Sequence, residues 1–280
     1  MTGKASALFT LGRPFTSLLG AVAIFAASFV GSGDNIRAYG LEVGLAVVIG
    51  YLFTSASNAL NDFFDRDIDR VNHPERPIPS GKISASTALI FSSTIFGVSV
   101  VLAVFLSLFS GVLVFLIVLT ALLFQLTYDL KVKKKKTVGN LFIGFETVLA
   151  FLFGGIVVKN PNPVMFMAIA SFLAITAREV VKDVEDIKGD IDKVSLPKII
   201  GIRRANMIAL ILISAAIATS VVSYYPLHVF GTGYFFAVLV ADALFICSMP
   251  LLFKNPNMAR RMWKYGMLLA LIAFIIGGIT

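Results

Sequence analysis

Three properties of the sequence predict an all-α, polytopic membrane protein. The chain has 280 residues, of which 58% are hydrophobic and only 14% are charged, whereas a soluble domain carries roughly 25% charged residues. The apolar residues also come in long blocks, and a transmembrane helix needs about 20 of them. These properties exclude a soluble globular enzyme and a disordered chain, and the single cysteine excludes a disulfide scaffold.

Nine apolar blocks follow one another along the chain. They predict nine transmembrane helices, at residues 14–31, 41–62, 86–107, 109–128, 139–158, 164–182, 205–222, 232–253 and 264–280. The first block is not a cleaved signal peptide, because it lacks a small-residue cleavage site and eight further blocks follow it. We therefore predict one integral-membrane domain over residues 1–280.

The basic residues predict the orientation of these helices. All of the 24 Lys and Arg residues except Arg37 and Lys159 fall on one side of the nine-helix arrangement. Such asymmetry marks the cytoplasmic side. We therefore place the N-terminus in the cytoplasm of a multi-pass cell-membrane protein and the C-terminus outside. The net charge of +8 then reflects basic loops, and no nucleic-acid partner is predicted.

The second predicted helix ends in a carboxylate-rich string. Its members are spaced four, three and four positions apart: Asn58, Asp62, Asp65 and Asp69. A helix places residues at this spacing on one face, and Asn61 begins a neighbouring stripe with Asp65 and Asp69. We therefore expect the helix to continue beyond the membrane surface.

The sixth predicted helix ends in a matching string. Its members repeat the same spacing: Glu179, Asp183, Asp186 and Asp190. Each lies 121 positions after its counterpart in the first string, which indicates a weak internal repeat of four helices. An even number of helices places both copies in the same orientation. Both strings are therefore expected to face one cytoplasmic site.

Two facing carboxylate clusters favour a divalent cation. Clustered carboxylates repel one another and are unfavourable near a low dielectric unless a cation neutralises them. Mg²⁺ takes oxygen ligands and commonly bridges to phosphate oxygens. The strings therefore predict a site for Mg²⁺ and a diphosphate. The alternative is a solvated acidic loop that nearby Arg and Lys balance.

Basic and polar residues near the two strings are candidates for binding the phosphate groups of a substrate. These candidates are Arg13, Asn58, Arg76, Tyr128, Lys131, Arg178 and Lys182. For Arg13 and Arg76, a purely topological role remains open. The run Lys133–Lys136 is typical of a positive-inside loop or an anchor for anionic lipid.

The string Asn61-Asp62-x-x-Asp65-x-x-x-Asp69, with Arg76-Pro77 after it, resembles the first signature of the UbiA superfamily of intramembrane prenyltransferases. The second acidic string is similar to that family's second signature. The resemblance implies a helical bundle around a central cavity, with a cytoplasmic cap built from the acidic loops. It also implies Mg²⁺-dependent transfer of an isoprenyl group from its diphosphate to an acceptor.

Carried over by position, the resemblance implies that seven residues ligate or orient Mg²⁺: Asn61, Asp62, Asp65, Asp69, Asp183, Asp186 and Asp190. Asp65, Asp69, Asp186 and Asp190 are the implied catalytic carboxylates among them. Arg13, Lys131, Arg178 and Lys182 are implied diphosphate contacts.

The first string and the loop after it look most like the archaeal-type enzymes of ether-lipid synthesis, the digeranylgeranylglyceryl phosphate synthases. These enzymes attach a second geranylgeranyl chain to geranylgeranylglyceryl phosphate, a lipid-phosphate acceptor. An aromatic quinone precursor or haem is the alternative acceptor within the superfamily.

Two acids inside predicted helices leave a secondary transporter open as another class of function. Glu146 lies in the fifth helix and Asp242 in the eighth, and intramembrane acids are typical of transporters. The two acids do not align at the 121-residue offset, and the acidic strings lie at helix ends rather than at the midplane, which favours the enzyme. Both acids are expected to pair with Asn, Ser or Thr of neighbouring helices. Trp263, before the ninth helix, fits an interfacial anchor.

Overall fold

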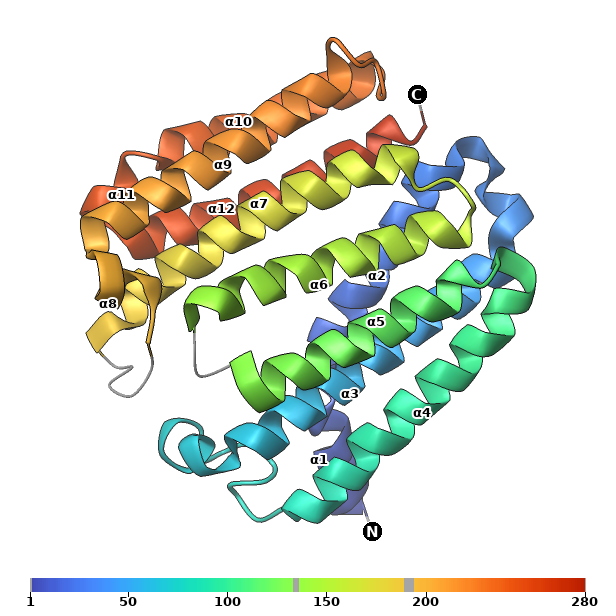
Figure 1. Ribbon diagram of the computed structural model, residues 1–280, viewed down its shortest axis with the longest axis vertical. Coiled ribbons are helices and arrows are strands. Elements are labelled where there is room, and N and C mark those ends of the chain that lie inside the picture. The colour runs from blue at the N-terminus through green and yellow to red at the C-terminus, as the bar shows by residue number, and fades with distance from the viewer. Residues whose placement is uncertain (1, 133–135, 189–193, 280) are drawn as a thin grey trace.

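The structure is a computed structural model that describes residues 2–132, 136–188 and 194–279. Helices make up almost all of these residues, and no strand occurs among them (Figure 1). The elements are α1 (Thr2–Leu11), α2 (Pro14–Ser32), η1 (Gly33–Tyr39), α3 (Gly40–Asn72), α4 (Ala85–Ser110), α5 (Leu113–Thr127), η2 (Tyr128–Val132), α6 (Lys136–Val157), α7 (Asn162–Glu185), η3 (Asp186–Lys188), α8 (Leu196–Ile200), α9 (Ile202–Tyr224), α10 (Thr232–Ser248), α11 (Leu251–Lys254) and α12 (Pro256–Gly277).

A helix of 15 residues or more lies in each predicted apolar block, although α4 ends inside the block at 109–128 and α10 ends inside the block at 232–253. In the described residues, seven stretches are long and apolar enough to cross a membrane. One of them, Pro14–Asn72, contains both α2 and α3, while the charged start of α12 keeps that helix out of the seven. The chain is therefore a multi-pass, all-helical membrane protein, and the count of nine crossings stays a prediction.

Helix α3 carries the first acidic string. It has 33 residues, or about 50 Å at 1.5 Å per residue, which exceeds the roughly 30 Å hydrocarbon core of a bilayer. The predicted continuation of this helix is confirmed, since it ends only at Asn72. The chain then turns back through the Arg76 loop to Ser84, whose Oγ accepts the N–H of Thr87 and caps α4.

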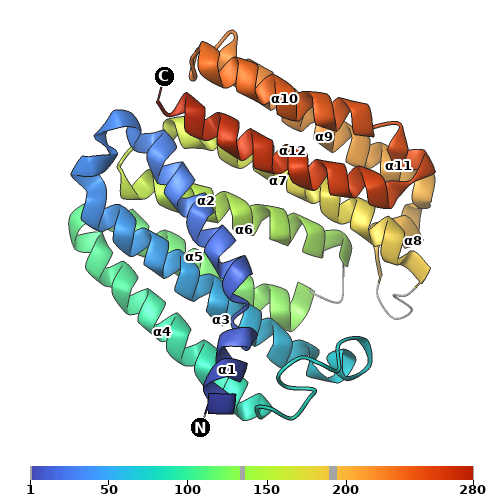
Figure 2. The same cartoon turned by 180° about the vertical axis from the view of Figure 1, so that it is seen from behind.

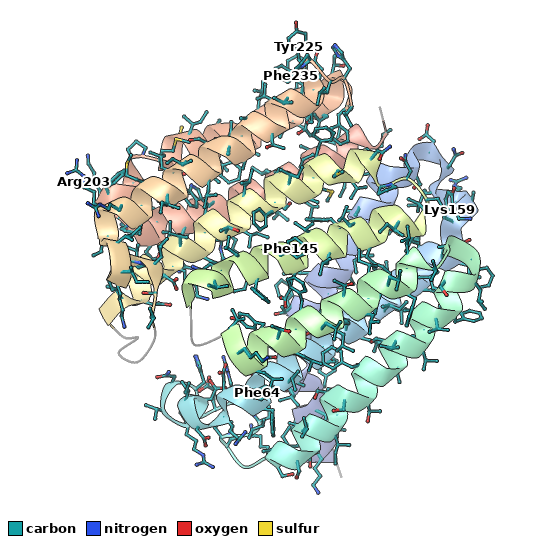
Figure 3. All side chains as sticks on the ribbon, in the orientation of Figure 1. Phe64, Phe145, Lys159, Arg203, Tyr225 and Phe235 are labelled. Carbon is teal, nitrogen blue, oxygen red and sulfur yellow. The ribbon has the colours of Figure 1, made fainter. Side chains whose placement is uncertain are left out.

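Three central helices, α2, α6 and α7, connect the N-terminal part of the bundle to its C-terminal part. Helix α2 packs on α3 and α6, α6 packs on α7, and α7 packs on α9 and α12 (Figures 1 and 2). The end of α3, the turn η2 and the end of α7 lie at the same end of the bundle. Both acidic strings are therefore presented on one side. Figure 3 labels Lys159 at the opposite end.

Gly154 allows α2 and α6 to cross closely. A Cβ atom at this position would lie 2.6 Å from the carbonyl oxygen of Ile24 and 2.8 Å from Cβ of Ala27. The hydroxyl of Ser28 also donates to the carbonyl of Gly154 over 3.1 Å. Because the obstacle includes backbone, a side chain at this position must push the helices apart.

Gly154→Ala is expected to destabilise the protein by about 1–3 kcal/mol through overpacking. Gly97→Ala on α4 is the matched control, since nothing lies within 4 Å of its Cβ position and Ala favours a helix over Gly by up to about 1 kcal/mol. Thermal unfolding in detergent measures both. Equal melting temperatures for the two variants would contradict the close crossing.

Trp263 is not an interfacial anchor, and that expectation is wrong. Its side chain is 0% exposed, and its indole N–H donates to Ser248 Oγ over 2.7 Å. It belongs to a buried cluster with Phe245 and Leu252. The start of α12 therefore directs this ring between helices. There apolar side chains pack on the ring and one hydroxyl accepts its N–H.

Candidate active site

A break between α1 and α2 brings Arg13 to the first acidic string. Arg13 has a φ of 47°, in the left-handed region. The carbonyl of the preceding Gly12 accepts the side-chain amide of Asn58 over 3.2 Å, and a Cβ at Gly12 would clash with Ser55. The break between α1 and α2 therefore packs directly against α3. Asn58, a predicted substrate contact, holds this break and also lines the cavity described below.

Two arginines neutralise two buried carboxylates of the first string. The side chains of Asp62 and Asp69 are 3% and 5% exposed. Arg13 pairs with Asp62, while Arg76 lies 2.6 Å from Asp69 and 3.4 Å from Asp62. A buried carboxylate is strongly unfavourable unless a cation compensates it. The sequence predicts both acids as metal ligands and both arginines as phosphate contacts. In this structure the acids and the arginines form ion pairs with one another.

The remaining members of the first string differ in their surroundings. Asp65 is half-buried on α3. Asn61 is also half-buried and lines the cavity. The helix therefore buries Asp62 and Asp69 against arginines, while Asn61 and Asp65 stay partly exposed.

The second string is arranged in a similar way on α7. Glu179 is buried and accepts Arg178 over 2.8 Å and Lys182 over 3.3 Å. Asp183 is buried and accepts the side-chain amide of Asn140, on α6, over 2.8 Å. The predicted phosphate contacts Arg178 and Lys182 thus balance a carboxylate of their own helix. Asp186 begins η3, immediately after α7, and Asp190 lies outside the described residues.

The turn η2 lies where α5 ends, beside both strings. It is a single π turn, a feature frequently found at functional sites. Gln125 donates to Asp129 over 2.7 Å, and both are buried. Lys131 is exposed. Carboxylates from four elements come within electrostatic reach of the Tyr128 phenol: Asp65, Asp129, Glu146 and Glu179.

Aromatic rings back this turn. The ring centroids of Phe142, on α6, and Tyr128 lie 6.4 Å apart. Phe145, labelled in Figure 3, stacks on Phe124 of α5 at 5.0 Å. The rings join α5 to α6 and position η2 between the two acidic strings.

A cavity of about 240 Å³ opens between α2, α3, α5 and α6. Its polar lining consists of Thr54, Ser57, Asn58, Asn61, Gln125 and Glu146. Its apolar lining includes Ile24, Ile49, Ile117, Val118, Leu149 and Phe153. Along α3, α5 and α6 the polar members lie closer to the acidic strings than the apolar members do. The cavity is therefore amphipathic, with its polar end at the site.

The donor chemistry fits a hard divalent cation that arrives together with a phosphate ligand. No group of three or more His, Cys, Asp or Glu side chains in the described residues could hold a metal ion by itself. Besides Asp62 and Asp69, the predicted ligands in the described residues are also oxygen donors: Asn61, Asp65, Asp183 and Asp186. Mg²⁺ usually binds through one or two carboxylates plus waters and substrate phosphates, so a complete cage of protein ligands is not required.

Sequence reasoning missed three residues of this site. Gln125, Asp129 and Asn140 are buried polar residues, and two of them contact one another while the third contacts the second string. The available signal was that each interrupts or borders an otherwise apolar block.

Comparison with known proteins agrees with this architecture. Residues 8–274 match the model of the UbiA prenyltransferase family. A digeranylgeranylglyceryl phosphate synthase from Methanosphaera stadtmanae is 34% identical over 275 residues, which are 95% of this chain and 97% of that protein. The synthase of the same name from Methanocaldococcus jannaschii is 38% identical over 242 residues, 84% of this chain and 83% of that protein.

Solved structures are similar as well. One reported for digeranylgeranylglyceryl phosphate synthase in membranes has a TM-score of 0.85 and 34% identity, and covers 99% of both chains. A UbiA homolog from Archaeoglobus fulgidus bound to GPP and Mg²⁺ has a TM-score of 0.67 and 18% identity, over 98% of this chain and 99% of that one. At this lower identity the likeness shows a shared fold.

Proposed function

The chain belongs to the UbiA prenyltransferase family, and we propose that it makes digeranylgeranylglyceryl phosphate for ether-lipid synthesis. In this reaction a geranylgeranyl group moves from its diphosphate to geranylgeranylglyceryl phosphate. Relatives named for this activity match nearly the whole chain. The observation that carries the proposal is the amphipathic cavity, whose polar end includes Asn61 of the first acidic string.

The polar end of the cavity is suited to the diphosphate of the donor. Asn61, Asp65 and Asp186, with Asp183 and Asp190, are the residues that would hold Mg²⁺ there. Bound Mg²⁺ neutralises charge on the phosphate oxygens, so that the diphosphate becomes a better leaving group. Related structures that hold Mg²⁺ with DMAPP or GPP support this metal.

The apolar end of the cavity is suited to the reacting isoprenyl chain. An allylic carbon that loses its diphosphate develops positive charge, and water must be excluded from it. Ile49 and Leu149 exclude water, while the rings of Phe53 and Phe153 can face the developing charge. The long tail continues along apolar helices that lipid surrounds.

The topology of the proposed enzyme has nine crossings, with the N-terminus and the acidic strings in the cytoplasm. The strings and the loops after α3 and α7 form a cytoplasmic cap over the cavity. The distribution of Lys and Arg supports this orientation, as does the position of Lys159 at the opposite end of the bundle. The burial of both Asp62 and Asp183 supports the 121-residue repeat.

Purified protein in detergent with Mg²⁺ and radiolabelled geranylgeranyl diphosphate tests the proposal. We expect a new ether lipid with geranylgeranylglyceryl phosphate and no product with 4-hydroxybenzoate. Removal of Mg²⁺ by a chelator should stop the reaction, and added Mg²⁺ should restore it. Prenylation of the aromatic acid instead, or ion flux in liposomes without any turnover, would overturn the proposal.

A further inference from the structure

Glu146 is an acid inside α6 that the proposed reaction has not yet used. It lines the cavity together with Asn61 and Gln125. Its Oε1 atom is buried and accepts no hydrogen bond within the described part of the chain. A buried polar atom without a partner costs about 1–3 kcal/mol, and more when it is charged. A ligand in the cavity can supply the missing partner.

Asp242, the second acid singled out within an apolar block, shows that an unpaired carboxylate oxygen is not a general property of this bundle. Asp242 on α10 accepts the hydroxyl of Ser220 over 2.8 Å. It does not line the cavity. The expectation that both acids pair with neighbouring helices is therefore confirmed for Asp242 and wrong for Oε1 of Glu146.

Glu146 lies close to the site, on its membrane side. It follows Asn140 by six positions, or about 9 Å along a helix at 1.5 Å per residue, and Asn140 contacts Asp183 of the second string. Asp129 and Tyr128, both on η2, lie within electrostatic reach of Glu146. Gln125 donates to Asp129, and Glu146 itself lines the cavity.

We propose that Glu146 binds the hydroxyl group of the acceptor and takes its proton, an inference that rests on the proposed function. The hydroxyl oxygen forms the new bond to C1 of the donor. The bond from C1 to the diphosphate oxygen breaks, and the diphosphate leaves with the electron pair. The hydroxyl proton moves to the carboxylate of Glu146. Positive charge on the allylic carbon favours the ionised carboxylate, and the acceptor class is an alcohol.

Glu146→Gln tests this role because Gln has the same shape but cannot take the proton. We expect transfer to geranylgeranylglyceryl phosphate to slow by about 10²-fold or more, the usual contribution of a positioned base. Binding of the donor, and its slow release of diphosphate to water without acceptor, should stay at wild-type levels. A purely structural role would lower both rates together, along with the melting temperature.

Two further variants sharpen the test. Glu146→Asp keeps a proton acceptor and should transfer faster than Glu146→Gln. Asp242→Asn removes an intramembrane acid outside the cavity and should keep the wild-type transfer rate. An Asp variant no faster than the Gln variant, or a Gln variant near the wild-type rate, would sink the inference. Failure of the wild type itself with this acceptor would instead sink the proposed function.

Discussion

Asp65→Ala is expected to abolish prenyl transfer while the protein stays folded. The side chain is half-buried on the first acidic string, and we assign it to the metal and diphosphate. Loss of such a ligand removes several kcal/mol of charge stabilisation, and each 1.4 kcal/mol changes a rate tenfold. The rate should therefore fall by about 10³-fold. Asp186→Ala should behave in the same way if both strings share one site.

Diphosphate release over a range of Mg²⁺ concentrations measures this effect. Asp67→Ala is the matched control. Asp67 lies two positions after Asp65 and carries the same charge, and its side chain is 69% exposed. It should keep near wild-type turnover and the wild-type Mg²⁺ dependence. Substantial activity in Asp65→Ala, or an equal loss in Asp67→Ala, would contradict a site shared by the two strings.

Arg76→Leu is expected to cause the largest loss of stability. Arg76 lies 2.6 Å from Asp69 and 3.4 Å from Asp62. Without it, Asp69 is a buried carboxylate that has lost its cation, and breaking a buried pair in this way costs about 3–5 kcal/mol. Asp62 keeps its pair with Arg13, so the damage should centre on Asp69. Thermal unfolding measures the loss.

A second substitution distinguishes the lost pair from lost packing. Asp69→Asn added to Arg76→Leu removes the uncompensated charge and should recover much of the stability. Arg70→Leu serves as control, because Arg70 is 70% exposed and pairs with the exposed Asp67, and such surface pairs contribute about 0–1 kcal/mol. If the double variant were no more stable than Arg76→Leu, the buried pair would not be the cause.

The helices could be predicted from the sequence because lipid leaves few alternatives. An apolar block of spanning length must satisfy its backbone internally, and within a bilayer a helix does this alone. The long helices consequently coincide with the predicted blocks. The extension of α3 was also predictable, since the spacing from Asn58 to Asp69 continues the helical period past the apolar residues.

The pairing of side chains could not be predicted, because it depends on how separate segments meet. Asp62 is neutralised because the break at Arg13 and the loop at Arg76 bring two guanidinium groups to it, and the sequence shows neither contact. Glu146 and Asp242 are likewise both lone acids in apolar helices. Which of them finds a hydroxyl depends on the facing helix.

Trp263 gave a wrong expectation for a related reason. Its position before the last apolar block is typical of an interfacial residue, but the rotation of α12 about its axis decides where the ring points. That rotation depends on the shape of α7 and α10, which pack against it.

The contact between Asn140 and Asp183 has a consequence for the biosynthesis of the protein. The two partners are 43 positions apart, so Asn140 emerges from the ribosome before Asp183 does. Asn140 therefore emerges without its partner, and Glu146 lies about two helical turns away from it. Insertion of α6 into the bilayer then depends on the apolar residues of this helix and on α2 and α3, which precede it in the chain. The acidic site next to the polar end of the cavity is thus completed only after α7 is made, when Asp183 accepts the side-chain amide of Asn140.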